Sequence, residues 1–368
     1  MQPKSAIPST DHPSNKMDPP TTASPVTGDF QFGIEARFYE KLHRQMVRCE
    51  LCPHLCVISE GQRGHCKVRE NQDGVLRSLV YARVCAAHVD PIEKKPFFHF
   101  LPGSRTFSVA TAGCNVHCTF CQNAEISQSR PEQLDADYLP PEHVVALARR
   151  LDCSSIAFTY GEPTVFAEYV MDTAALARQA GLRTVVVSNG YIRPQALRAA
   201  YAQVDAVKID LKSFSERYYR DVVKARLQPV LDTLVTLREM GTWTEIVYLL
   251  IPTLNDSDEE LRAMASWLHS HLGADIPLHF SQFHPDYELQ NLPKTPLPTL
   301  ERAREIARSA GLRYVYIGNV PGHHAQHTNC SHCDAVVVER QGFAASRMLI
   351  QQGLCPFCQQ PVAGVWQP

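Results

Sequence analysis

Residues 113–123 read GCNVHCTFCQN, and this stretch carries Cys114, Cys118 and Cys121 in the spacing C-x3-C-x2-C. No fourth cysteine lies close enough in the sequence to complete the set. A cubane iron–sulfur cluster is usually held by four thiolates. Three thiolates in one loop would therefore bind three irons and leave the fourth iron open, and an open metal position is typical of a reactive site. Three buried cysteines of a hydrophobic core are the alternative, although a core does not require this spacing.

Strands and helices are expected to alternate along the chain around this stretch. Strands are expected at 105–112, 155–160, 183–188, 205–211, 244–251, 276–283 and 314–317, and helices at 141–151, 165–180, 194–201, 215–240, 256–272 and 300–310. Repeated β–α units give parallel strands that are joined by right-handed crossovers and covered by helices. The sequence therefore predicts an α/β fold, a complete or partial (β/α) barrel over residues 101–318.

Unusual polar residues follow several of the predicted strands. The cysteine loop follows the first strand, Glu162 the second and Asn189 the third, and Asp210 and Lys212 lie at the end of the fourth. Because the carboxyl ends of the strands in such a barrel form one rim, we expect these residues to lie close together. Each also has a structural interpretation. Glu162 suits a helix start, Asn189 suits a turn, and the last two suit a structural ion pair.

A second group of cysteines lies before the barrel, within residues 30–100. Cys49, Cys52, Cys56 and Cys66 supply four thiolates. Four thiolates can close a tetrahedral zinc site or hold an auxiliary iron–sulfur cluster, and the spacing does not decide between these metals. Four reduced cysteines without a metal are the third interpretation.

The end of this segment leads into the barrel. A strand is predicted over Leu79 to Cys85, and Lys94 and Lys95 follow it. Neighbouring lysines usually lie on a solvated face, and we expect this of both residues. The alternative is that they bind SAM, a substrate or a redox partner.

Two further cysteine pairs lie in residues 319–368. Cys330 with Cys333, and Cys355 with Cys358, form two C-x2-C knuckles around a segment that suits a small hairpin. Paired knuckles are typical of a zinc ribbon, so zinc is the expected metal and a rubredoxin-like iron is the alternative. A module of this size has little core of its own, so a metal would supply much of its folding free energy.

The composition is ordinary for a soluble protein. The 368 residues carry a formal net charge of −2, so no basic excess points to nucleic acid. No uninterrupted apolar run is long enough to span a bilayer. The 13 cysteines cluster at metal-binding spacings, which favours a reducing compartment, and we expect the protein in the cytoplasm. Residues 1–29 are rich in proline, serine and threonine, and a disordered tail is expected there.

The spacing C-x3-C-x-Phe-C, formed by Cys114, Cys118, Phe120 and Cys121, resembles the signature of radical S-adenosylmethionine (SAM) enzymes. The resemblance implies that the three cysteines hold a [4Fe–4S] cluster whose open iron binds the amine and carboxylate of SAM. It further implies an electron donor, such as flavodoxin or ferredoxin, and cleavage of SAM to a 5′-deoxyadenosyl radical that takes hydrogen from a substrate. The implied fold is a partial (β/α) barrel of about six units.

The resemblance also implies roles for the residues at the strand ends. The stretch from Tyr160 to Glu162 is similar to the "GGE" element that binds the SAM amino group, with Tyr160 in place of the first glycine. A carboxylate suits an ammonium through charge-assisted hydrogen bonds. Asn189 resembles the element that contacts the SAM ribose or carboxylate. Asp210 and Lys212 resemble the Asp-x-Lys element of glycyl-radical activating enzymes.

Several stretches together resemble the radical SAM member of the AmmeMemoRadiSam system, over roughly residues 34–366. These stretches are DPIEKKP at 90–96, FTYGEP at 158–163, HFSQFHP at 279–285 and GNVPGH at 318–323. The resemblance implies Memo-type and AMMECR-type proteins as partners. The family is also similar to pyruvate formate-lyase activating enzymes.

Three functional hypotheses follow from the sequence. The first is a radical SAM enzyme that abstracts hydrogen from an unidentified small-molecule or partner-bound substrate. The second is an activating enzyme that installs a glycyl radical on a partner protein. The third, from another class, is a non-catalytic iron–sulfur or zinc protein that transfers electrons or acts as a scaffold.

Overall fold

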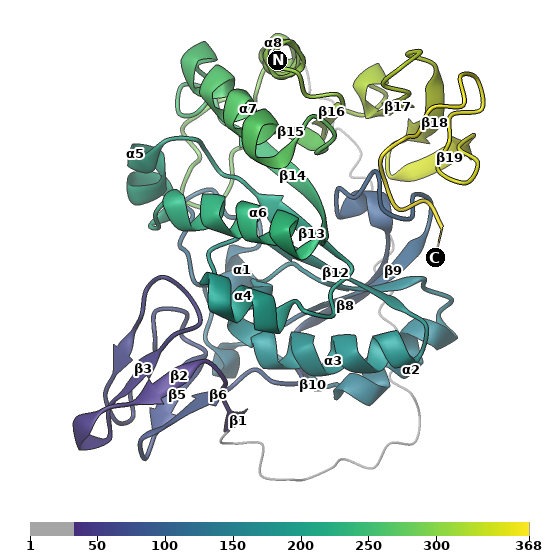
Figure 1. Ribbon diagram of the computed structural model, residues 1–368. Coiled ribbons are helices and arrows are strands. Elements are labelled where there is room, and N and C mark those ends of the chain that lie inside the picture. The colour runs from purple at the N-terminus through teal and green to yellow at the C-terminus, as the bar shows by residue number, and fades with distance from the viewer. Residues whose placement is uncertain (1–32, 368) are drawn as a thin grey trace, which may run out of the picture. The chain divides into compact units, whose positions relative to one another are not determined.

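An eight-stranded sheet runs through the described part of the chain, which is residues 33–367 of this computed structural model. The strands of this sheet are β8 (Ala86–Pro91), β9 (Arg105–Ala110), β11 (Ser155–Phe158), β12 (Arg183–Ser188), β13 (Ala206–Asp210), β14 (Trp243–Leu250), β15 (Leu278–Gln282) and β16 (Val315–Gly318). Their order is β16-β15-β14-β13-β12-β11-β9-β8 (Figure 1). All pairs from β9 to β16 are parallel, and the edge strand β8 is antiparallel to β9. The tail predicted over residues 1–29 lies outside the described residues.

Helices connect the parallel strands and cover one face of the sheet, called the outer face below (Figure 1). They are α1 (Ala124–Ser127), α2 (Pro141–Arg150), α3 (Ala167–Gln179), α4 (Pro194–Ala200), α5 (Glu216–Tyr218), α6 (Gln228–Met240), α7 (Asp258–Leu272) and α8 (Leu297–Ser309). Proline stands in the first turn of α2, α4, α6 and α8, where its missing N–H costs no helical hydrogen bond. The side chain of Ser257 caps α7 by accepting from the amide of Glu260. The predicted α/β alternation is confirmed.

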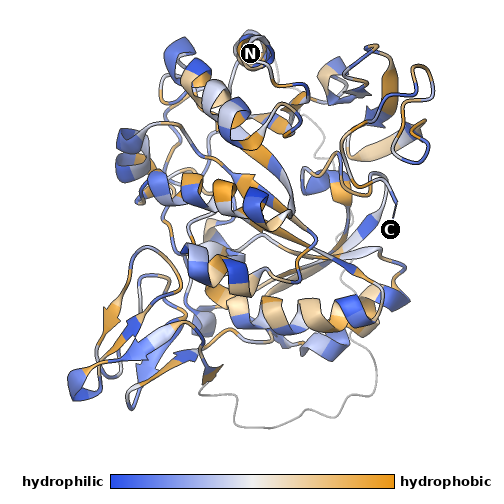
Figure 2. Cartoon of the chain, viewed as in Figure 1, coloured by the Kyte–Doolittle hydropathy of each residue, from blue (hydrophilic) through white to orange (hydrophobic). Residues whose placement is uncertain are grey.

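Successive residues of each strand point to opposite faces of the sheet. Phe107, Ile156, Val186, Val207 and Ile246 are fully buried on the outer face, in one core with the helices. Figure 2 accordingly shows strongly hydrophobic strands beneath helices that carry both hydrophobic and hydrophilic residues. The opposite, inner face is where the polar residues of the strands gather.

A short segment after β8 covers the inner face near the beginnings of the strands, and we call residues 92–101 the floor. Its apolar side chains form a cluster of their own with inward-facing residues of three strands. The members of this cluster are Ile92, Phe97, Phe100, Leu101, Ala157, Val185 and Ala206.

Two expectations for this region are wrong. The strand predicted over Leu79 to Cys85 is only β7 (Arg83–Val84), because residues 79–82 form a turn in which Ala82 has a φ of +59°. Lys95 does not lie on a solvated face, since it is only 3% exposed and its ammonium lies 2.7 Å from Asp90 Oδ2. Its neighbour Lys94, with 45% of its side chain exposed, follows the expectation.

The N-terminal segment forms two small antiparallel sheets beside the large one. Their strands are β1 (Ile34–Glu35), β5 (Arg69–Gln72) and β6 (Val75–Ser78) in one sheet, and β2 (Tyr39–Lys41), β3 (Val47–Cys49) and β4 (Val57–Ile58) in the other. Arg69 joins the first sheet to α3 through a buried ion pair with Glu168. The side chains of both residues are 1% exposed. Separately, β7 pairs with β10 (Asp137–Tyr138).

The C-terminal segment forms a three-stranded sheet of β17 (Thr328–Asn329), β18 (Val336–Gln341) and β19 (Ala344–Met348). It packs under the floor. The buried Arg340 donates to the carbonyl oxygen of Phe98 at 2.7 Å, and Leu101 N donates to Val365 O at 2.7 Å. The guanidinium also lies 3.9 Å from the buried carboxylate of Glu93. The C-terminal segment therefore holds the floor in place.

Candidate functional site

The cysteine loop begins directly after β9 and packs against the N-terminal segment. Gly113 has a φ of +97°, and a Cβ atom there would lie 2.5 Å from Val68 Cγ1 and 3.0 Å from the carbonyl oxygen of Cys66. Both the backbone conformation and the close approach therefore require glycine. The segment with the first four cysteines thus forms one wall of the loop.

The three cysteines of the loop are free thiols. Burial raises the pKa of Cys114 well above that of an ordinary thiol, and the charge of Glu162 adds to this rise. Asn189 Nδ2 donates to Cys114 Sγ at 3.6 Å, and Cys121 Sγ lies 3.2 Å from Ser127 Oγ. Adjacent thiolates in such a place need a bound cation, so the donor set fits an iron–sulfur cluster.

Glu162 stands at the amino end of a short helix, η5 (Pro163–Phe166), and is 3% exposed. Its carboxylate accepts from Thr164 N at 3.0 Å, from Ser188 Oγ at 2.7 Å and from Asn189 N at 2.9 Å. Burial raises its pKa, and these hydrogen bonds oppose the rise. Because Asn189 also touches Cys114, the structure joins Glu162 to the cysteine loop.

Asp210 and Lys212 form the second polar group at this rim. Lys212 Nζ lies 2.9 Å from Asp210 Oδ2, and Lys208 pairs with the other oxygen. Burial favours the neutral carboxyl, but the two ammoniums lower the pKa of Asp210 to about 2. Lys212 lies 5.8 Å from the ring centroid of Phe120, and negative charge on Cys118 helps to raise its pKa. Lys212 is thus placed to balance thiolate charge in the loop.

The four N-terminal cysteines interact with one another, but their sulfur atoms are not grouped as closely as those of the four C-terminal cysteines. Cys49 N donates to Cys56 O at 2.9 Å. Burial raises the pKa of Cys66 to about 11, and charge on Cys49 and Cys56 contributes. Burial also raises the pKa of Cys52, and the charge of Cys49 adds to this rise. These thiols also need a cation in order to ionise together, and zinc and an iron–sulfur cluster both stay predictions.

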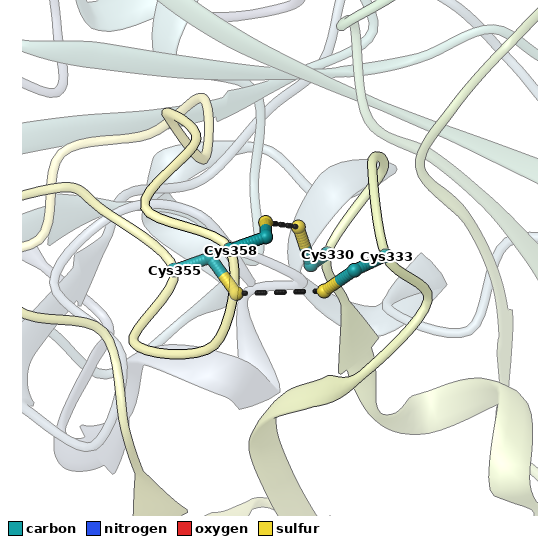
Figure 3. Close-up of side chains that lie close together, drawn as sticks. All are labelled: Cys330, Cys333, Cys355 and Cys358. Atoms are coloured by element: carbon teal, nitrogen blue, oxygen red, sulfur yellow. Dashed lines mark hydrogen bonds between the residues drawn. The ribbon is translucent and has the colours of Figure 1, made fainter.

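The four C-terminal cysteines come together most closely. Cys330 Sγ lies 3.6 Å from Cys358 Sγ, and Cys333 Sγ lies 3.7 Å from Cys355 Sγ (Figure 3). All four sulfur atoms lie within 4.8 Å of one another, and within residues 33–367 no other group of three or more such ligands does so. Hydrogen bonds from neighbouring amides and cysteines overcome burial and lower the pKa of Cys355 to about 7. These cysteines could hold one metal ion.

Sequence reasoning missed several residues of the site. Asn115 donates to Tyr191 O at 2.6 Å and accepts from Asn189 Nδ2 at 2.9 Å, so it links the cysteine loop to the segment that follows β12. Its place within the cysteine stretch could have drawn attention to it. Lys208 lies on the inner face of β13 and is 4% exposed, and only the alternation of residues along that strand could have indicated it.

Known proteins resemble this chain in sequence. The family model of the radical SAM superfamily matches residues 108–265. An uncharacterized protein of Methanocaldococcus jannaschii is 44% identical over 330 residues, which is 89% of this chain and 98% of that protein. A pyruvate formate-lyase-activating enzyme of Clostridium pasteurianum is 23% identical over 204 residues, 52% of this chain and 84% of that enzyme.

A solved structure aligns with part of this chain. A radical SAM methyltransferase of Sphaerobacter thermophilus aligns with 59% of this chain and 67% of its own, at a TM-score of 0.47 and 19% identity.

Within residues 33–367, none of the helices has the length and apolar character that a membrane crossing demands.

Proposed function

Residues 108–265 form a domain of the radical SAM superfamily, and from this premise we propose that the chain cleaves SAM reductively and abstracts hydrogen from an unidentified substrate. The observation that carries the proposal is the network in which Asn189 contacts both the carboxylate of Glu162 and Cys114 Sγ. When bound, the cluster and SAM supply a 5′-deoxyadenosyl radical. The network would put the groups that recognise the two cofactors side by side.

Each of these residues has its own proposed role. Cys114, Cys118 and Cys121 would hold the cluster. The carboxylate of Glu162 has about four acceptor positions, of which three are used, and the fourth would receive the SAM ammonium. Asn189 would orient the SAM ribose or carboxylate. Asp210 holds the ammonium that faces the thiolates.

The site would sit at the mouth of a partial barrel. The repeated β–α units between β9 and β16 and the floor beneath them support this architecture. We also propose that residues 30–100, 101–318 and 319–368 act as a cysteine-rich segment, a barrel and a zinc-ribbon-like module. A reducing compartment, the cytoplasm, suits an open cluster, and Memo-type and AMMECR-type proteins are the partners suggested by the sequence.

The two other cysteine groups would be structural or auxiliary metal sites. Zinc is proposed at the C-terminal cysteines, because their tight grouping supports a single tetrahedral ion. Zinc or a second iron–sulfur cluster is proposed at Cys49, Cys52, Cys56 and Cys66.

The proposal is tested by EPR spectroscopy on anaerobically reconstituted, dithionite-reduced protein with and without SAM, and by an assay for 5′-deoxyadenosine. We expect a [4Fe–4S]⁺ signal that shifts when SAM is added, and 5′-deoxyadenosine in the same sample. Cys118→Ala is expected to lose the SAM-dependent shift and to retain the zinc proposed at the C-terminal cysteines. An unshifted wild-type signal without 5′-deoxyadenosine would refute SAM chemistry and favour a non-catalytic electron-transfer or scaffold protein.

An activating enzyme for a glycyl radical protein is the second candidate. The similarity to the Clostridium pasteurianum enzyme and to a benzylsuccinate synthase activating enzyme of Thauera aromatica, 23% identical over 181 residues, favours it. It requires a glycyl radical signal on a partner protein after incubation with SAM. The absence of this signal while 5′-deoxyadenosine forms would leave the first candidate.

A further inference from the structure

Four cysteines of the N-terminal segment surround one space. They are Cys49, Cys52, Cys56 and Cys66. Burial raises the pKa of the Cys52 thiol, and the charges of the other three cysteines add to this rise. The amide of His65 donates to Cys56 Sγ at 3.5 Å, so the segment that carries Cys66 folds back onto the earlier cysteines. One metal centre could therefore take all four thiolates.

The spread of the sulfur atoms distinguishes this group from the C-terminal one. Four thiolates bound to one zinc ion at about 2.3 Å have sulfur atoms about 3.8 Å apart. Two sulfur pairs of the C-terminal group, at 3.6 Å and 3.7 Å, match this spacing. Within residues 33–367, no three of the N-terminal sulfur atoms lie within 4.8 Å of one another, and the same holds for Cys114, Cys118 and Cys121. Because a cubane cluster binds each thiolate on a different iron, its ligands lie farther apart than those of a single ion. The N-terminal spread therefore suits a cluster better than zinc.

The N-terminal cysteine segment lies directly against the loop of residues 113–123. A Cβ atom on Gly113 would lie 3.0 Å from the carbonyl oxygen of Cys66. His54 donates through Nε2 to the carbonyl oxygen of Asn115 at 2.7 Å. Gly113 and Asn115 flank the first cysteine of the loop. Backbone atoms on both sides of that cysteine are thus in contact with the N-terminal segment.

Three histidine rings lie between the two cysteine groups. The ring centroids of His54 and His65 are 4.2 Å apart, and those of His65 and His117 are 4.5 Å apart. His65 directly precedes Cys66, and His117 directly precedes Cys118. The rings therefore form a continuous path of contacts from one cysteine group to the other. Electrons pass between metal centres most readily when packed atoms fill the space between them, and this path supplies such atoms.

The N-terminal group also comes close to the surface. Cys52 and Cys56 are half-buried. Their neighbours Leu55 and Val57 are 41% and 59% exposed. An electron donor could therefore approach a metal centre at these cysteines from solvent.

We propose that the four N-terminal cysteines bind a second [4Fe–4S] cluster, not zinc, and that this cluster passes electrons to the cluster of the loop. A one-electron carrier protein, such as a flavodoxin, reduces the oxidised N-terminal cluster to [4Fe–4S]⁺ and is itself oxidised by one electron. That electron then reduces the loop cluster to [4Fe–4S]⁺, and the N-terminal cluster returns to its oxidised state, so no bond forms or breaks. The relay rests on the proposed function, which supplies the electron acceptor, whereas the metal assignment is independent of SAM.

The metal assignment is tested by removing the loop cluster from the full-length protein. The triple variant Cys114→Ala/Cys118→Ala/Cys121→Ala is reconstituted anaerobically, and its iron and sulfide are measured. We expect about four iron and about four sulfide per chain, and after reduction an EPR signal that SAM does not shift. A folded triple variant without iron, whether or not it holds zinc at the N-terminal cysteines, would overturn the assignment.

A second variant keeps this test decisive if the triple variant does not fold. Cys52→Ser/Cys56→Ser in the otherwise wild-type chain replaces two half-buried ligands and should lose about four iron per chain. Cys85→Ser is the matched control, because Cys85 is also half-buried and belongs to none of the three cysteine groups. It should lose no iron. An iron content of the double variant equal to that of the wild type would also overturn the assignment.

The relay is tested with the same double variant, Cys52→Ser/Cys56→Ser. Reduced by dithionite, a small donor that can reach the loop cluster directly, it should keep the EPR signal that SAM shifts. Reduced by flavodoxin, it should lack this signal at a mixing time at which the wild type shows it. Equal reduction of both proteins by flavodoxin would refute the relay. A dithionite-reduced wild type without a SAM shift would instead refute the proposed function, and iron in the triple variant would still support the second cluster.

Discussion

Glu162→Gln is the substitution that tests the candidate SAM site most directly. The carboxylate accepts through both oxygens, with Thr164 N and Ser188 Oγ on one and Asn189 N on the other. A glutamine keeps one of these oxygens and replaces the second with an NH₂ group. That NH₂ would face the amide of Asn189, and the negative charge proposed to attract the SAM ammonium would be lost.

The two consequences have different sizes and different readouts. A buried N–H without an acceptor costs about 1–3 kcal/mol of folding free energy. Loss of a hydrogen bond to a charged group costs about 1.5–3 kcal/mol of binding free energy, which weakens SAM affinity about ten-fold to about a hundred-fold. Stability is measured by urea denaturation, and SAM affinity by equilibrium dialysis of the reconstituted protein.

Glu245→Gln is the matched control for this prediction. Glu245 is also fully buried and accepts backbone N–H groups through both oxygens, from Phe98 and His99, but it lies near the beginning of β14, away from the rim. We expect a comparable loss of stability and no change in SAM affinity. If Glu162→Gln lowers stability but binds SAM as tightly as the wild type, the carboxylate has a structural role only and the assignment fails.

Two further predictions concern buried charges. Arg340→Met should lower the free energy of unfolding by about 3–5 kcal/mol, because it leaves Glu93 buried without its counter-charge. Arg347→Met, at a side chain that is 61% exposed, should change it by less than about 0.5 kcal/mol in the same urea titration; equal effects would show that the C-terminal segment docks without the buried pair. The folded pKa of Asp210, about 2, lies below the unfolded value of about 3.9. Its stabilising effect is therefore complete above about pH 4 and is lost as the pH falls toward 2. Asp210→Asn should remove that part of the acid sensitivity in denaturation curves at pH 5 and pH 3, and an unchanged pH dependence would contradict the pairing with Lys208 and Lys212.

Local patterns in the sequence predicted the elements that depend on neighbouring residues. The alternation of strands and helices from residue 105 is set by hydrophobic periodicity, and the order of the parallel strands follows from it. The gathering of Cys330, Cys333, Cys355 and Cys358 also followed from spacing, because two short knuckles can meet across a hairpin. The expectation of a strand over residues 79–85 was wrong, because residues 79–82 form a turn.

Spacing could not reveal contacts between residues that lie far apart in the chain. Asn115 joins the cysteine loop to the third parallel strand only because the sheet brings β9 and β12 to the same rim. Arg340 is buried because the C-terminal segment packs under the floor, and no pattern near it in the sequence indicates this.

By itself, the sequence determined the kind of chemistry that the chain carries, since three closely spaced cysteines and regular β–α units are local features. Only the tertiary structure decided which charged side chains are buried on the inner face. Lys95 looked like a solvated lysine, yet its ammonium lies between Asp90 and the ring of Tyr160, which come from two separate segments. Burial and pairing depend on which segments meet in space, and that is set when the floor closes over the sheet.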